Sequence, residues 1–181
     1  MEGRLLEKKV SSSIIYEGRV VTLRVDQVVT QSGRMTSREV VDRRDTVSVL
    51  PLDDMGRVLL VRQFRYAVGV STLEIPAGSV DAGETPSQAA HRELREETGF
   101  DCHSLTELLT YYPAMGYSTE RMTVYLAKDL APAPLRGDEE DIHVDRKPFD
   151  EVYDGVATGD STFLDAKSNL AVMLVRSRGL A

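Results

Sequence analysis

The chain has 181 residues, 41% of them hydrophobic and 28% charged, which is typical of one soluble globular domain with a sizeable core. It carries 22 basic and 29 acidic residues, for a net charge of −7. This balance argues against broad electrostatic binding to nucleic acid, which needs a basic surface. A small phosphate-bearing ligand is not excluded, because a bound metal ion can reverse the local sign of charge.

Cysteine content and hydropathy limit the compartment in which the protein works. Cys102 is the only cysteine, so no intramolecular disulfide can form, and a structural thiol is favoured over a catalytic one. The segment 1–16 lacks the apolar centre of a signal peptide, and no apolar run reaches the roughly 18 residues of a membrane helix. We therefore expect a cytoplasmic protein that does not enter the membrane.

A small antiparallel β extension, residues 1–44, is predicted to precede a main domain that covers residues 45–181. Alternating apolar residues predict a strand from Ile14 to about Val29, followed by a turn and a returning strand at 38–41. Two hairpin strands alone are only marginally stable in water. We therefore expect the extension to pack on another surface, such as a second subunit.

The main domain is predicted to begin with a hairpin whose strands cover 46–52 and 58–63. The second strand is followed by Arg65, for which a substrate-binding role is favoured, because a guanidinium group suits phosphates and stacked bases. The alternative is a core strand that merely ends in polar residues. Glu74, on the next strand, fits either a substrate contact or a carboxylate at the rim of the sheet, and the sequence leaves both open.

A helix is predicted from Pro86 to Thr98 by the residues at its two ends. Thr85 is a suitable N-cap, and Gln88 completes a capping box with it. Gly99 lies where a left-handed C-cap is needed.

Three carboxylates, those of Glu93, Glu96 and Glu97, lie on neighbouring rows of this helix, near the end where its dipole disfavours negative charge. As a solvated acidic face, each like-charge pair would cost only about 0.2–0.5 kcal/mol. A hard divalent cation would also explain the cluster, because Mg²⁺ binds carboxylate oxygens. Charge alone does not separate the two interpretations.

The spacing of the cluster does separate them. From Gly78 to Phe100 the sequence GSVDAGETPSQAAHRELREETGF fits every fixed position of the Nudix box, G-x5-E-x7-R-E-U-x-E-E-x-G-U, where U is a bulky apolar residue. The chain thus resembles a Nudix hydrolase, over about residues 16 to 178. The resemblance implies an α/β/α sandwich with a mixed sheet. It also implies an N-terminal antiparallel extension, through which relatives that act on ADP-ribose form homodimers.

The resemblance further implies that the protein binds Mg²⁺, with Mn²⁺ as an alternative. The implied ligands are one main-chain carbonyl and three helix carboxylates: Ala77, Glu93, Glu96 and Glu97. Arg92 is expected to pair with nearby carboxylates and hold them in place, and Glu84 to support the site electrostatically.

The segment 131–141 is acidic and rich in proline, which predicts a loop. Read without the resemblance, such a run is a solvated connection. In this subfamily, however, a glutamate on such a loop acts as the catalytic base. Glu140, or otherwise Glu139, is therefore the candidate that activates the attacking water, with Glu96 and Arg92 completing the catalytic set.

The joint at 112–120, between two predicted strands, is expected to form part of the substrate pocket. Relatives specific for ADP-ribose have a proline 15 residues after the box, where this chain has Met115. Gly116 and Glu120 keep the rest of the family pattern and are expected to contact substrate. The missing proline favours a broader range of nucleotide sugars.

The remaining elements are predicted to be two strands flanking this joint, at 105–111 and 121–126, and two helices at 148–157 and 165–177. The second helix is expected to bury four apolar residues: Leu170, Val172, Met173 and Leu174. The histidines show no ligand spacing relative to one another or to Cys102, so no chemistry is assigned to His91, His103 or His143.

The predicted function is hydrolysis of the diphosphate bond of nucleoside diphosphate sugars, of the ADP-ribose, ADP-glucose and GDP-mannose class, to a nucleoside monophosphate and a sugar phosphate. Removal of pyrophosphate from RNA 5′ ends is one alternative, disfavoured by the acidic composition and the lack of a basic stripe. A sensor that binds ADP-ribose without cleaving it is disfavoured by the intact box. A purely structural acidic helix would leave the register of the box unexplained.

Overall fold

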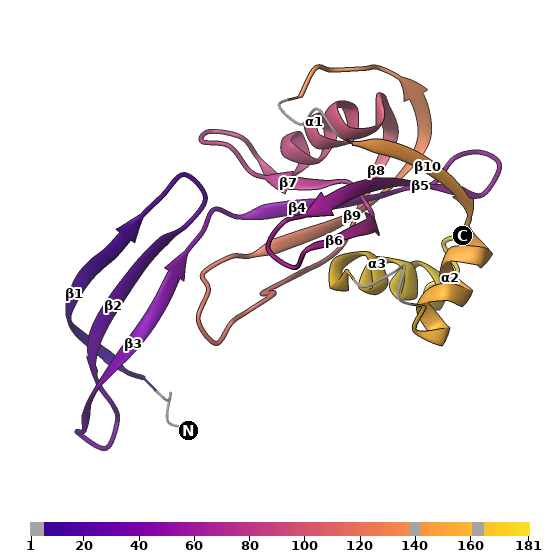
Figure 1. Ribbon diagram of the computed structural model, residues 1–181. Helices are drawn as coiled ribbons and strands as arrows, with labels where there is room; N and C mark the ends of the chain where they lie inside the picture. The colour runs from indigo at the N-terminus through magenta and orange to yellow at the C-terminus, as the bar shows by residue number, and fades with distance from the viewer. Residues whose placement is uncertain (1–5, 138–141, 161–164) are drawn as a thin grey trace. The chain divides into compact units, whose positions relative to one another are not determined.

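The computed structural model describes residues 6–137, 142–160 and 165–181 (Figure 1). The chain divides into two compact units, which are discontinuous in sequence. The first contains Met1–Asp45 and Tyr111–Arg121, and the second contains Thr46–Thr110 and Met122–Ala181. A stretch from the middle of the chain thus belongs with the N-terminal strands.

The first unit contains a three-stranded antiparallel sheet in the order β1-β2-β3. Its strands are β1 (Lys8–Glu17), β2 (Thr22–Val29) and β3 (Met35–Asp42). The prediction of one strand from Ile14 to Val29 was wrong, because the chain turns at Gly18, whose N–H donates to the carbonyl of Val21 at 3.0 Å. The alternation of apolar residues continues across this turn and so conceals it.

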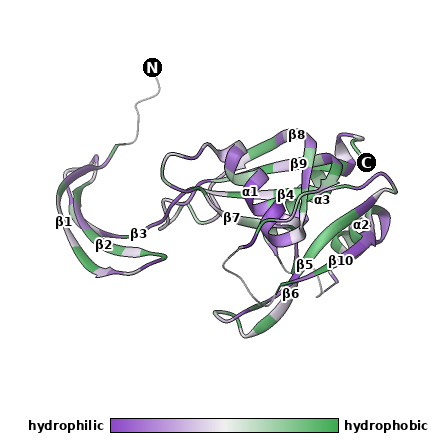
Figure 2. Cartoon of the chain, turned by 90° about the horizontal axis from the view of Figure 1, so that it is seen from above, coloured by the Kyte–Doolittle hydropathy of each residue, from purple (hydrophilic) through white to green (hydrophobic). Residues whose placement is uncertain are grey.

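Exposed apolar side chains gather on β1, where Val10, Ile14, Ile15 and Tyr16 are each more than half exposed. Figure 2 shows such apolar stretches in green on β1 and β2. The sheet therefore offers apolar surface to solvent, and the homodimer expected through these strands stays a prediction.

The joint at 112–120, between β8 (Phe100–Tyr111) and β9 (Met122–Pro132), is bonded to β3 within the first unit. Val41 N–H donates to the carbonyl of Tyr117 at 2.8 Å, and Thr119 N–H donates back to the carbonyl of Val41 at 3.1 Å. An ion pair between Arg121 and Asp45, at 2.5 Å, lies in the same unit. These bonds explain why the joint belongs with the N-terminal strands.

The second unit contains a mixed four-stranded sheet in the order β7-β4-β9-β8. Its strands are β4 (Thr46–Pro51), β7 (Ala77–Ser79), β8 (Phe100–Tyr111) and β9 (Met122–Pro132). β4 runs antiparallel to β7 and parallel to β9. Every residue of β4 is buried, including the polar Thr46 and Ser48.

A second, antiparallel sheet in this unit has the order β10-β5-β6. Its strands are β5 (Arg57–Arg65), β6 (Val70–Glu74) and β10 (His143–Pro148). The predicted hairpin of β4 and β5 holds only at its turn, where Leu52 bridges Val58. Beyond the turn the two strands enter different sheets: β4 pairs with β7 and β9, whereas β5 pairs with β6 and β10.

Three helices complete the second unit: α1 (Pro86–Thr98), α2 (Phe149–Thr158) and α3 (Ala166–Ser177). In Figure 1, α1 covers one side of the sheets while α2 and α3 lie on the other, which gives the predicted α/β/α layers. Ala89, Ala90 and Leu94 of α1 pack into a cluster with Val47 and Val49 of β4. No helix within the described ranges is long and apolar enough to span a bilayer.

The buried side of α3 differs from the prediction. Met173 is 43% exposed, and Leu170 and Leu174 are only partly buried. The buried residues are Lys167, Ser168, Ala171, Val172 and Val175. They follow the spacing of one helical face, whereas the predicted set followed hydrophobicity alone and did not keep to one face.

Candidate active site

The ends of α1 fix the register of the helix that carries the acidic residues. Thr85 Oγ1 accepts a hydrogen bond from Gln88 N–H at 3.2 Å, and Gln88 Oε1 accepts one from Thr85 N–H at 2.9 Å. Gly99 ends the helix at a φ of 78°, in the left-handed conformation that favours glycine. The predicted helix and both caps are confirmed.

The main chain of β7 lies directly against the carboxylates of α1. Glu97 Oε2 accepts a hydrogen bond from Ala77 N–H at 3.2 Å. A Cβ on Gly78 would lie 2.0 Å from Glu93 Oε1, so only glycine permits this approach. The structure therefore brings Ala77 beside the helix glutamates, although the two are distant in sequence.

Arg92 links several of these carboxylates through one guanidinium group. It donates two hydrogen bonds to Glu84, at 3.0 and 2.9 Å, and single bonds to Glu93 at 2.6 Å and to Glu96 at 3.1 Å. A further bond reaches the carbonyl of Ser79 at 2.8 Å. The bonds that Glu84 accepts from Arg92 lower the pKa of Glu84, and the same bonds are the main reason that the pKa of Arg92 is raised.

The cluster combines several carboxylates with one arginine. Glu84, Glu93 and Glu96 bind the guanidinium of Arg92, Asp81 lies 3.9 Å from it, and Glu97 binds the main chain of β7. The donors are carboxylate and main-chain oxygens, which suit Mg²⁺ or Mn²⁺ rather than a soft metal. The close approach of Gly78 to Glu93 is the observation that fits such a site, since a side chain there would displace the carboxylate.

A segment that follows β9 runs along the end of α1. Arg95 Nε donates to the carbonyl of Ala133 at 3.0 Å, and a Cβ on Gly137 would lie 3.1 Å from Cβ of Glu96. The sequence did not predict this contact. Glu139 and Glu140, the candidates for the catalytic base, lie outside the described residues.

Arg65 and Glu74 bind each other in a buried network of the second unit. Glu74 is 3% exposed and accepts two hydrogen bonds from Arg65, at 2.8 and 2.6 Å. It also accepts bonds from Thr72 and from Lys167 of α3. Burial alone would raise the pKa of Glu74, but the bonds from Arg65 and the charge of Lys167 outweigh it and lower that pKa to about 2.

Lys167 is the member of this network that sequence reasoning missed. Its amino group also lies 2.8 Å from Asp165, the N-cap of α3. The adjacent Ser168 Oγ accepts a hydrogen bond from Ile75 N–H at 2.9 Å, so α3 is tied to the end of β6. A buried lysine is rare unless it is paired, and its partner here lies 93 residues away in sequence.

The other three predicted substrate residues belong to the first unit. Met115 is 78% exposed, and Glu120 forms an ion pair with Arg43 at 3.5 Å. Gly116 has open space where a Cβ would lie. Their contribution to a substrate pocket stays a prediction.

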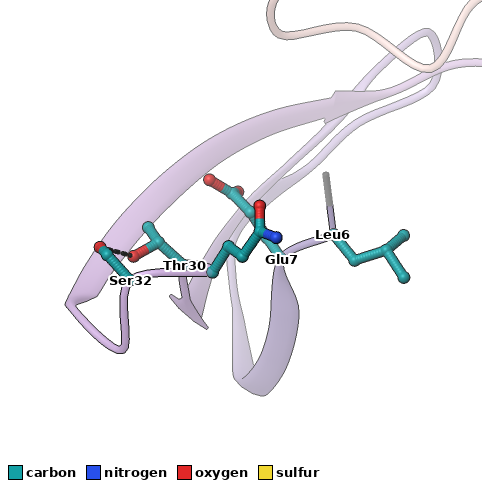
Figure 3. A pocket seen from close by; sticks show the side chains of 5 residues that line it. Leu6, Glu7, Thr30 and Ser32 are labelled. Atoms are coloured by element: carbon teal, nitrogen blue, oxygen red, sulfur yellow. Dashed lines mark hydrogen bonds between the residues drawn. The ribbon is translucent and has the colours of Figure 1, made fainter. Parts of the chain in front are cut away.

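A hollow of about 730 Å³ lies on the first unit, lined by Leu6, Glu7, Thr30, Gln31 and Ser32 (Figure 3). Glu7 accepts a bond from Arg38 Nε at 3.0 Å, and the hydroxyls of Thr30 and Ser32 bond each other. No carboxylate of the acidic helix lines it, so we assign it no part in catalysis.

The fold and the acidic helix together define a family. The NUDIX domain matches residues 42–166, which is more than half of the chain, and the chain therefore belongs to the Nudix family of hydrolases. A crystal structure of an ADP compounds hydrolase matches with a TM-score of 0.86 and 28% identity, covering 97% of this chain and 96% of that one. The predicted fold is thus confirmed.

Two relatives show the range of proteins that share this sequence pattern. The ADP-ribose pyrophosphatase of Bacillus subtilis (strain 168) is 35% identical over 150 residues, covering 83% of this chain and 78% of that protein. The methanol dehydrogenase activator of Bacillus methanolicus is 33% identical over 178 residues, covering 96% of this chain and 95% of that protein.

Proposed function

We propose that this enzyme hydrolyses the diphosphate bond of ADP-sugars, foremost ADP-ribose, to AMP and a sugar phosphate. The observation that carries the proposal is the cluster of Glu93, Glu96 and Glu97 against the main chain of β7, with Arg92 bonded to the first two. The names of the relatives, ADP-ribose pyrophosphatase and ADP compounds hydrolase, support this choice of substrate. The proposal also includes the wider range of nucleotide sugars, such as ADP-glucose and GDP-mannose, that the sequence predicts.

The ligands proposed for Mg²⁺ or Mn²⁺ are the carbonyl of Ala77 and the carboxylates of Glu93, Glu96 and Glu97. A divalent cation bound there would neutralise the charge that develops on the diphosphate oxygens. Arg92 acts on these side chains rather than on substrate. Its fixed fork holds Glu84, Glu93 and Glu96 in one arrangement, so the ligands need little reorganisation when the ion binds.

Glu140, or otherwise Glu139, is the proposed general base. It would take a proton from the water whose oxygen attacks one phosphorus, while the bridging P–O bond breaks and its oxygen leaves with the other phosphate. The support is that Gly137, shortly before both glutamates in sequence, already lies against Glu96.

For substrate binding we propose that Arg65 contacts the nucleotide and that Glu74 is a positioning residue. The side chain of Arg65 is 38% exposed, whereas that of Glu74 is 4% exposed, so only the arginine faces solvent. The paired carboxylate fixes the plane of the guanidinium. Met115, Gly116 and Glu120 keep their predicted role as further substrate contacts.

The test is a substrate panel assayed with Mg²⁺, in which released nucleoside monophosphate is quantified for the nucleotide sugars and released pyrophosphate for the RNA. The panel contains ADP-ribose, ADP-glucose, GDP-mannose, UDP-glucose and RNA with a 5′-triphosphate. We expect release of AMP from ADP-ribose, lost on chelation and restored by Mg²⁺ or Mn²⁺. Cleavage of the RNA alone would contradict the proposal, and so would ADP-ribose binding without cleavage in the presence of metal.

A further inference from the structure

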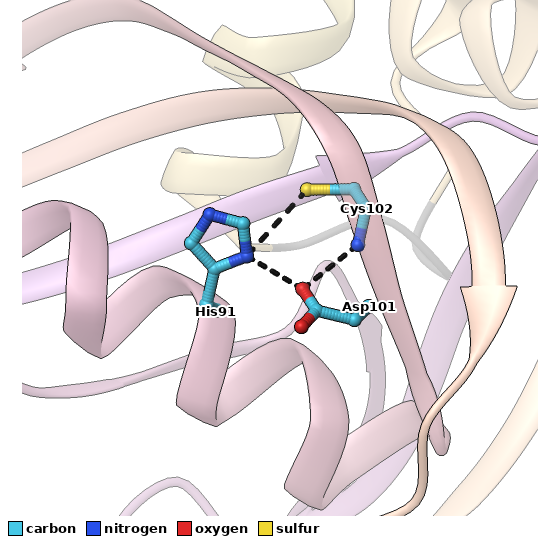
Figure 4. Close-up of side chains that lie close together, drawn as sticks. All are labelled: His91, Asp101 and Cys102. Carbon is cyan, nitrogen blue, oxygen red and sulfur yellow. Dashed lines mark hydrogen bonds and ion pairs between the residues drawn. The ribbon is translucent and has the colours of Figure 1, made fainter.

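Three side chains with metal-binding atoms converge between α1 and the start of β8 (Figure 4). His91 Nδ1 lies 2.5 Å from Asp101 Oδ1 and 3.9 Å from Cys102 Sγ. All three candidate ligand atoms lie within 4.8 Å of one another. Spacing in the sequence did not predict that His91 lies near Cys102; the two meet because the left-handed cap at Gly99 returns the chain beside the helix.

This cluster is separate from the acidic cluster of the candidate active site. Residues of an α-helix are spaced by about 100° around its axis, which places His91 about 160° from Glu93, about 140° from Glu96 and about 120° from Glu97. The imidazole therefore lies on a different flank of α1 from the carboxylates. An ion at one cluster would not share ligands with an ion at the other.

The donor atoms of the two clusters select different metals. A thiolate, an imidazole and a carboxylate form a donor set typical of Zn²⁺, whereas Mg²⁺ takes oxygen ligands. Tetrahedral Zn²⁺, with a Zn–S distance of about 2.3 Å and a Zn–N distance of about 2.0 Å, separates sulfur from nitrogen by about 3.5 Å. The 3.9 Å between Cys102 Sγ and His91 Nδ1 is close to this value.

The arrangement leaves room for the adjustment that an ion requires. The hydrogen bond between His91 and Asp101 must open by less than about 1 Å to admit an ion between them. Both side chains can move, since they are 36% and 34% exposed, whereas Cys102 is held in the core at 8% exposure. The thiol is thus a fixed ligand and the other two are adjustable.

The charges around the thiol also favour a cation. Burial raises the pKa of Cys102 to about 11, and the carboxylates of Asp101 and Asp129 add to that effect. The two carboxylates attract a divalent ion, whose coordination displaces the thiol proton against the cost that burial adds. The positive charge of Arg95 opposes this attraction, because its guanidinium lies near enough to Asp101 to lower the pKa of that carboxyl.

We propose that His91 Nδ1, Asp101 Oδ1 and Cys102 Sγ form a Zn²⁺ site, with a water molecule as the fourth ligand. The ion would join the middle of α1 to the first residues of β8. Because the three ligands come together only in the folded chain, Zn²⁺ binding stabilises the fold. The function of the ion is therefore to hold the helix that carries the catalytic carboxylates.

Co²⁺ is the probe for this site, because a cobalt–thiolate bond produces a charge-transfer absorption band in the near ultraviolet. Cys102 is the only cysteine, so the band reports this site even if the acidic cluster also binds Co²⁺. We expect one equivalent of Co²⁺ to give the band in the full-length protein. Excess Mg²⁺ should leave it unchanged, and one equivalent of Zn²⁺ should abolish it.

Two variants remove ligands and one is a matched control. Cys102→Ser should abolish the band, and His91→Ala should weaken Co²⁺ binding at least tenfold. His103→Ala, which removes an exposed imidazole on the same strand, should change neither. No band in the wild-type protein at millimolar Co²⁺, or equal affinity in the wild-type protein and His91→Ala, would overturn the proposal.

Thermal unfolding provides a second measurement that does not depend on Cys102→Ser folding correctly. With Mg²⁺ present throughout, saturating Zn²⁺ should raise the Tm of the wild-type protein by about 3 °C or more. The partly exposed position of His91 makes His91→Ala the variant of choice, and its Tm should not respond. An equal rise in both proteins would place Zn²⁺ at the acidic cluster alone and contradict the proposal.

Discussion

Two groups of charged residues in the second unit resemble each other in composition but differ in how their charges pair. In the acidic cluster, Glu84, Glu93 and Glu96 all bind the guanidinium of Arg92, and Glu97 binds the main chain of β7. In the network around Glu74, the two carboxylates of Glu74 and Asp165 are matched by the cations of Arg65 and Lys167. Under the proposed function, the first group binds a cation from solution, whereas the second stabilises the fold.

The largest expected effect tests the acidic cluster. Glu97→Gln should lower the turnover of ADP-ribose at least about 100-fold, because it removes the charge of a proposed metal ligand. Its free energy of unfolding should change by no more than about 1 kcal/mol, since the loss of one like charge offsets the weaker bond to Ala77. Turnover with saturating Mg²⁺ and urea unfolding measure the two quantities.

Glu107→Gln is the control for this variant, since it neutralises an exposed glutamate of β8 outside the cluster. It should leave turnover unchanged. Near-normal turnover in Glu97→Gln would show that Glu97 is not a metal ligand.

Acid should lower the stability of the protein through the balanced network around Glu74. The folded pKa of Glu74 is lowered to about 2 from an ordinary 4.5. The stability that the charged form contributes is thus complete above about pH 4.5 and is lost as pH falls toward 2. This loss is on the order of 3 kcal/mol. Urea unfolding at pH 6 and pH 3 measures this loss. Between the two pH values, the free energy of unfolding should fall more in the wild-type protein than in Glu74→Gln. Equal losses in the two proteins would mean that other carboxylates cause the acid sensitivity.

Removing a cation from the balanced network should cost stability. Lys167→Met should lower the free energy of unfolding by about 2 kcal/mol, because Glu74 stays buried with fewer partners. Lys147→Met is the matched control: it breaks an exposed pair with Glu151, four residues further along the chain, and should cost less than about 0.5 kcal/mol. Similar costs in the two variants would mean that burial does not distinguish these ion pairs.

The smallest effect concerns the cap that places the acidic cluster. Thr85→Ala should cost about 1 kcal/mol of stability, because Gln88 N–H loses its acceptor at the start of α1. Turnover at a temperature well below unfolding should fall less than about twofold. A large loss of turnover would show that the register of α1 depends on this cap more than on its packing.

The acidic helix could be predicted from sequence because its determinants are local. Thr85, Gln88 and Gly99 lie next to the turns that they cap, and the spacing of the box already contains the register of its glutamates. The pairing of Glu74 with Lys167 could not be predicted, because it depends on how the strands and α3 pack. The same reason applies to the strand β10 and to the partners of β4.

Errors and omissions in the prediction had equally local causes. Apolar alternation continues through the turn at Gly18, so two strands were read as one. His91 and Cys102 were judged by their separation in sequence, which says little once Gly99 reverses the chain. For the candidate base at Glu140, the guides are the family resemblance and the position of Gly137 beside Glu96.

The bonds from α3 to the end of β6 also set an order of events during synthesis. Until the ribosome has released residues 165–177, Glu74 lacks its bond from Lys167, and the N–H of Ile75 lacks Ser168 Oγ as acceptor. The nascent second unit therefore carries polar groups that it cannot yet bury. A chain stalled before α3 should remain sensitive to protease, even though its acidic helix has already been made.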